Sequence, residues 1–249
     1  MTNNEIQKWR ERASELIADN RLNEAFRILR SMTPGQSWRV VNEIDKAEED
    51  YALMLNYAMD GVDDPHRKAV YDGIVSRLYT LVDRVSREAT MNDSPTLYFS
   101  SVRYENMQLD TLGSLMASYR KLCDNTSLFN MATGMAGRDD RQEKERLEHR
   151  LFAKVWTAFP LGRDDAEVIG ALWRDAVIPS YFKELIVSAL LMGGLEYYDE
   201  SALMLLLDAY SEGDARLSVK AMCAALILMS LYRGRIVGTR ISSRIAALR

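Results

Sequence analysis

Residues 183–192 read KELIVSALLM and residues 219–228 read VKAMCAALIL, and both place apolar side chains at the spacing of a helix. Each stretch follows a shorter apolar segment, WRDA at 173–176 and LLDA at 206–209. The paired segments are offset by about 33 to 36 residues, a period typical of helical-hairpin repeats. The repeated order of short helix, loop and long helix predicts two stacked hairpins in the last third of the chain.

The same helical spacing extends towards the N-terminus. It runs through residues 6–17 and 22–32, where Pro34-Gly35 ends it, and a third helix is expected from about Ser37 to Met59. Asp64 suits an N-cap and Pro65 the first turn of a helix. We expect the buried stripe of that helix at Val70, Ile74, Leu78, Leu81 and Val85.

Proline and glycine are few, at 5 and 13 among 249 residues, which favours long helices over turn-rich β structure. Further helices are predicted over about 109–122 and 127–131, and from residue 138 to residue 159. The sequence therefore predicts an all-α fold of ten or so helices. They form antiparallel helical hairpins stacked as an α-α superhelix.

Gly134 and Gly137 provide the best internal break, because the charged run RDDRQEKERLEHR follows them. We expect an N-terminal helical block over residues 1–134 and a C-terminal repeat block over residues 138–249.

The overall charge and the apolar runs exclude several classes of protein. The formal net charge is -4 and the pI is about 5.4, so nucleic acid is not the expected partner. The longest apolar run, 221–231, is too short to cross a bilayer, which takes about 20 residues. The N-terminus lacks an apolar signal segment, and Cys123 and Cys223 form no CxxC motif. We expect a cytoplasmic protein without disulfides.

Motifs for catalysis or cofactor binding are missing from the sequence. The two histidines, His66 and His149, lie in different predicted helices and belong to no HExxH motif. The phosphate-binding patterns GxxxxGK[ST] and GxGxxG are absent too, as is GxSxG. We therefore expect no metal, no cofactor and no enzymatic activity.

Aromatic and basic clusters are the candidates for an interaction surface. Tyrosine is enriched at interfaces because it offers a large contact area at a small entropic cost. The C-terminal stretch from Ala215 to Arg249 has basic residues but no Asp or Glu, so we expect it to be a docking edge or the edge of a longer array. The candidate surface residues are Tyr98, Phe99, Tyr104, Tyr197, Tyr198, Arg233, Arg235, Arg240 and Arg244.

Two segments resemble known helical repeats. The residues that match the bulky and small positions of a tetratricopeptide repeat are Trp9, Ala13, Leu16, Ala25, Leu29 and Met32. Arg12 and the early Pro34 depart from that pattern, and the match covers about one repeat. Residues 164–232 are similar to two HEAT-type hairpins. The resemblance is to bacterial α-solenoids, whose members mostly bind other proteins along a concave surface.

Three functions follow as hypotheses. The first is a non-enzymatic scaffold that binds a protein or peptide, with self-association through the C-terminal edge as a further expectation. The alternative is a HEAT-like nucleic-acid binder that uses the basic C-terminal segment. The second alternative is a helical enzyme with a pocket between hairpins.

Overall fold

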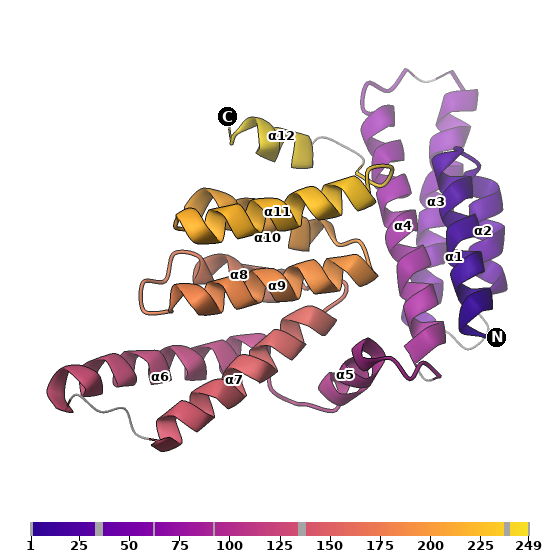
Figure 1. Cartoon of the computed structure of the whole chain (residues 1–249). Coiled ribbons are helices and arrows are strands. Elements are labelled where there is room, and N and C mark those ends of the chain that lie inside the picture. The colour runs from indigo at the N-terminus through magenta and orange to yellow at the C-terminus, as the bar shows by residue number, and fades with distance from the viewer. Residues whose placement is uncertain are drawn as a thin grey trace. The chain divides into compact units, whose positions relative to one another are not determined.

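A computed structural model of the chain describes residues 2–32, 37–61, 63–91, 93–133, 138–236 and 240–248. These residues form twelve α-helices and no strand, which confirms the predicted all-α fold (Figure 1). The helices are α1 (Asn3–Ala18), α2 (Leu22–Ser31), α3 (Trp38–Met59), α4 (Arg67–Met91), α5 (Leu97–Asn106), α6 (Leu112–Thr133), α7 (Arg138–Thr157), α8 (Arg163–Leu172), α9 (Ser180–Glu196), α10 (Glu200–Glu212), α11 (Ala215–Leu231) and α12 (Arg240–Ala246).

The first of two compact units comprises Met1–Phe99 and Tyr232–Ala247. Within it, α1 packs on α2 and α4, and α3 packs on α2 and α4. Helix α1 begins with a capping box: the Glu5 N–H donates to the Thr2 hydroxyl, and the Thr2 N–H donates to the Glu5 carboxylate. Phe26, Leu29, Ile44 and Leu78 are fully buried in the core of this unit.

The second unit comprises Ser100–Leu231 and Leu248–Arg249. Helix α7 packs on α6 and α9, and α9 packs on α10 and α11. The half-buried Asp199 carboxylate caps α10 by accepting the N–H groups of Ser201 and Ala202, at 2.8 and 3.3 Å. It also accepts the Leu161 N–H at 2.6 Å, which fixes the loop between α7 and α8 to the start of α10.

Two details of the helix prediction were wrong. The separate helices expected over 109–122 and 127–131 are one helix, α6, because neither proline nor glycine interrupts residues 114–133. Val70 was expected to be buried, but 43% of its surface is exposed. The buried positions of α4 begin at Ile74 instead.

The predicted boundary between the two blocks falls on residues 134–137, outside the described residues. Helices α6 and α7, on either side of it, pack on each other within the second compact unit. The boundary stays a prediction.

Across the residues that the structure describes, no helix combines the length and the hydropathy needed to cross a membrane.

Candidate interaction groove

The C-terminal half of α3 and the first turns of α4 extend past the buried core of the first unit. The buried residues of α3 are Val40, Ile44 and Ala47, and none follows them in the helix. Figure 1 shows the α3–α4 hairpin reaching beyond the ends of α1 and α2. Tyr51 and Met54 of α3 still pack against the buried core, whereas Leu53, Tyr57 and Val70 are exposed.

A groove with a cavity volume of about 400 Å³ lies between these two helix segments. From α3 it is lined by Leu53, Met54 and Tyr57, and from α4 by Val70 and Ile74. Leu53 and Tyr57 are 52% and 53% exposed, and they lie four residues apart on one face of α3. The volume is within the usual range for ligand sites, and the lining is mainly apolar.

Gly73 keeps the groove open. It lines the groove from the middle of α4, and a Cβ atom built on it would meet no heavy atom within 4 Å. Glycine destabilises a helix interior by about 0.5–1 kcal/mol relative to alanine. The local helix therefore gains nothing from Gly73, whereas a larger side chain there would occupy the groove.

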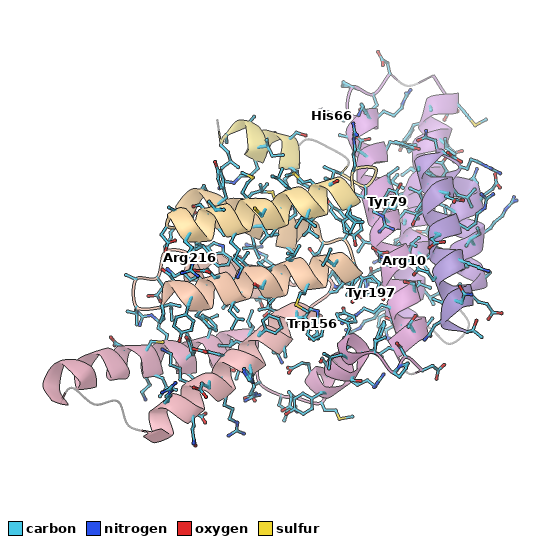
Figure 2. All side chains as sticks on the ribbon, viewed as in Figure 1. Arg10, His66, Tyr79, Trp156, Tyr197 and Arg216 are labelled. Atoms are coloured by element: carbon cyan, nitrogen blue, oxygen red, sulfur yellow. The ribbon has the colours of Figure 1, made fainter. Side chains whose placement is uncertain are left out.

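Both signs of charge flank the apolar lining. Asp50 and Arg77 form an ion pair at 3.0 Å on one side of the groove, and Asp64 and Arg67 also line it. Asp64 accepts the backbone N–H of His66 at 2.8 Å at the start of α4, where Figure 2 marks His66. An apolar strip edged by charges of both signs suits an amphipathic partner.

Most of the aromatic residues that the sequence suggested for a surface are not exposed. Tyr98 and Phe99 are buried and pack edge to face, with ring centroids 5.2 Å apart. Tyr197, which Figure 2 labels, stacks on Phe159 at 4.9 Å. Tyr197 and Tyr198 are both buried, whereas the Tyr104 side chain is 57% exposed. The burial contradicts the expectation of exposure for four of these five residues, because their rings complete the packing of short helices and loops.

The basic C-terminal residues are divided between solvent and an internal ion pair. Arg233 and Arg240 are exposed, and Arg244 is half-buried. Arg235 instead donates to Asp83 of α4 at 2.6 Å and to the Ser14 hydroxyl of α1 at 2.9 Å. Arg235 therefore fastens the C-terminal part of the first unit and is not a free surface charge.

Asp83 is the centre of this internal ion pair. Its side chain is 1% exposed and also accepts from Arg10 Nε at 2.7 Å. The Arg235 guanidinium lies 5.0 Å from the centroid of the Tyr79 ring, and burial raises the pKa of Tyr79. Arg10 and Tyr79 are labelled in Figure 2. Two arginines on one carboxylate make this a structural link rather than a reactive acid.

A second polar cluster joins α6, α7 and α9 in the other unit. The hydroxyls of Tyr119 and Tyr181 both donate to Glu148 Oε1, at 2.7 and 2.6 Å. Burial raises the pKa of Tyr119 and also the pKa of Cys123, so both groups stay protonated near neutral pH. Neither side chain is activated as a nucleophile in this state.

The described residues contain no group of three or more His, Cys, Asp or Glu side chains placed to hold a metal ion.

The groove was missed by the sequence analysis, although two signals for it are present. Leu53 and Tyr57 are apolar side chains four residues apart in the helix predicted over 37–59, and Gly73 interrupts an otherwise strong helical pattern. Neither signal predicts that α1 and α2 end before the loop between α3 and α4, because that depends on the lengths of α1 and α2.

No protein-family model matches the chain, and neither does any curated protein or solved structure.

Proposed function

We propose that the chain is a protein-interaction module that binds an amphipathic helix of a partner protein in the α3–α4 groove. The observation that carries this proposal is the uncovered apolar lining between two helices, with Leu53 and Tyr57 more than half exposed. Exposed apolar surface that gathers in a concave site is typical of interaction sites.

A helix is the partner element that fits this shape best. The groove is formed by two helix faces with apolar residues spaced four apart, Leu53 and Tyr57 on α3 and Val70 and Ile74 on α4. A third helix would continue the packing of the first unit, presenting its own apolar residues at i, i+3, i+4 and i+7. The Asp50–Arg77 pair would meet the polar edge of that helix.

The helices of the second unit support a scaffold made of HEAT-type hairpins. Helices α8 and α9 have 10 and 17 residues, and α10 and α11 have 13 and 17 residues, so the short–long order recurs. Polar links join the two pairs: Ser180 donates to Asp214 at 2.7 Å, and Arg216 pairs with Glu184 at 3.1 Å. These features favour a stacked-hairpin scaffold in the second unit.

The nucleic-acid alternative is less well supported. It relied on the basic C-terminal segment, and Arg235 of that segment is engaged with Asp83. Weak binding that falls steeply with salt would favour this alternative over the groove.

The test is a selection from a displayed library of random peptides of about 15 residues, enough for four helical turns. We expect the enriched peptides to carry apolar residues at i, i+3 or i+4, and i+7, and to become helical on binding. A photo-crosslinking amino acid at Tyr57 should capture them, whereas the same group at Ala52, exposed on the opposite face of the same helix and outside the groove lining, should not.

Extended or purely basic peptides among the enriched sequences would contradict the proposal. So would equal crosslinking from positions 57 and 52, because it would mean that the peptides do not bind specifically in the groove.

A further inference from the structure

The segment of chain that forms the α3–α4 groove is more acidic than the rest of the protein. From Lys46, one turn before the lining begins, to Arg77, where it ends, there are seven Asp and Glu residues and four Lys and Arg residues. This segment therefore carries a net charge of -3 with His66 neutral, whereas the whole chain of 249 residues carries -4. The charge around the groove thus favours a partner of the opposite sign.

Ion pairs within the segment neutralise two of its four cations. Arg77 pairs with Asp50 at 3.0 Å, and Lys68 pairs with Asp72 at 3.0 Å. Each of these cations already has a carboxylate beside it, so neither is left to balance the other acidic residues.

Three exposed carboxylates remain around the groove. Glu49 directly precedes the first lining residue of α3, and Asp60 and Asp63 lie at the end of the groove where the chain passes from α3 to α4. None of the three has an ion pair with another residue that the structure describes. The two other cations of the segment, Lys46 and Arg67, leave the rim of the groove negative.

The position of Asp60 is unfavourable for the helix that it ends. Asp60 is the C-cap of α3, and the C-terminal end of a helix carries a partial negative charge. Its carboxylate is therefore repelled by the helix. A positive charge supplied by a bound partner would offset this repulsion.

We infer that the partner of the groove is a basic amphipathic helix, with Lys or Arg side chains along its polar edges opposite Glu49, Asp60 and Asp63. Its apolar stripe would lie on Leu53 and Val70. The inference rests on the proposed function, because it specifies which kind of helix the groove binds. An acidic helix with the same apolar stripe would be repelled by the rim, and charge would thus select the partner.

The experiment is a fluorescence-anisotropy titration of the whole chain with three labelled peptides of about 15 residues. All three have the same leucines at i, i+3, i+4 and i+7, and their polar edges are made of lysine, glutamine or glutamate, all good helix formers. At about 0.05 M salt, the lysine peptide should bind at least about tenfold more tightly than the glutamate peptide, with the glutamine peptide between them. At about 1 M salt, where the Debye length is about 3 Å, the three affinities should converge.

Two double variants separate the rim charge from charge elsewhere in the first unit. Asp60→Asn with Asp63→Asn should weaken the lysine peptide at least about threefold and leave the glutamine peptide unchanged, because only charge is lost. The control, Glu11→Gln with Glu15→Gln, removes the same charge from exposed positions of α1. It should change neither affinity by more than about twofold.

A third variant tests whether the peptides bind in the groove or adhere to an acidic surface. Gly73→Leu fills the groove and should weaken all three peptides at least about tenfold. An unchanged affinity of the lysine peptide for this variant would place that peptide outside the groove and overturn the inference.

Two further outcomes separate the inference from the proposed function. Equal binding of the lysine and glutamate peptides at low salt, or an unchanged affinity of the lysine peptide in the Asp60 and Asp63 double variant, would overturn the inference alone. If the folded wild-type protein bound none of the three peptides, the proposed function would fail and the inference would fail with it.

Discussion

At the scale of single residues, the most consequential group is the carboxylate of Asp83. It receives Arg10 and Arg235 at 2.7 and 2.6 Å, with both guanidinium groups mostly buried. The periodicity of α4 explains why residue 83 faces inward, since Leu81, Val82 and Val85 around it are also buried. The sequence did not show that its partner would be Arg235, because the contact depends on where the chain returns after α11.

Replacement of Asp83 by alanine should destabilise the first unit by about 3–5 kcal/mol, because two buried arginines would lose their counter-charge. The matched control is Asp50→Ala, which breaks the exposed pair with Arg77 and should cost about 1 kcal/mol or less. Urea unfolding, followed by circular dichroism, measures both. Equal losses of unfolding free energy in the two variants would show that the buried ion pairs of Asp83 stabilise the protein no more than the exposed pair does.

Asp175 gives a pH dependence with a defined sign. Partial burial opposes the shift, but the Val177 N–H and Arg120 together hold the pKa of Asp175 below its ordinary value. A carboxyl group whose pKa is lower in the folded state stabilises the protein above its unfolded pKa of about 3.9. That contribution is lost as the pH falls through the folded pKa.

Wild type should therefore be more stable than Asp175→Asn at pH 6, and the difference should shrink as the pH falls below about 4. Thermal unfolding at a series of pH values compares the two proteins. A difference that stays constant down to pH 2.5 would mean that the charge of Asp175 does not stabilise the fold.

At the scale of helices, the all-α class and the positions of most helices could be predicted from the sequence, whereas the superhelical stacking stays a prediction. Asp64 and Pro65 indicated where α4 starts, and the sparse prolines and glycines indicated most of the other helix ends. The start and end of a helix depend on local residues, so the sequence predicts them well. The burial of a given aromatic side chain cannot be predicted in this way. Tyr98 and Tyr197 lie near helix ends, and the residues that cover them come from elsewhere in the chain.

The close contact between α9 and α7 depends on the absence of a side chain at Gly193. A Cβ atom at Gly193 would lie 2.8 Å from the backbone oxygen of Trp156, where α9 approaches α7. Gly193→Ala should therefore destabilise the second unit by about 1–3 kcal/mol, because backbone must move. Gly170→Ala is the control, since its Cβ would meet Leu205 at an ordinary 3.7 Å.

The control should leave stability unchanged or raise it by about 0.5–1 kcal/mol, as helix propensity dictates. Denaturant unfolding of both variants is the measurement. A Gly193→Ala protein as stable as wild type would mean that α9 and α7 do not need this close approach.

At the scale of the whole molecule, the first unit is built from two segments that lie far apart in the sequence. Residues 1–99 supply α1 to α4, and Tyr232–Ala247 returns to the same unit after the second unit has been completed. Arg235 connects to Asp83 across 152 positions of the sequence. Local patterns predict helices but not such a return, which is why the sequence placed the boundary between two consecutive blocks.

Deletion of residues 232–249 should destabilise the first unit more than deletion of residues 239–249, because only the longer deletion removes Arg235 and the buried Tyr232. The second unit should keep its own unfolding transition in both proteins. Differential scanning calorimetry checks this. If the two deletions lowered the transition equally, the Arg235 link would not hold the first unit together.

The α3–α4 groove is the central claim at this scale, and substitution of Gly73 tests it most directly. The measurement is the affinity of a selected helical peptide for wild type, Gly73→Ala and Gly73→Leu, by isothermal titration. The alanine protein should be about 0.5–1 kcal/mol more stable and should still bind, because one methyl group meets nothing in the groove. The leucine protein should fold as well as wild type but lose binding at least about tenfold, since its side chain fills the space between Leu53 and Val70. Undiminished binding by a folded Gly73→Leu protein would contradict the account.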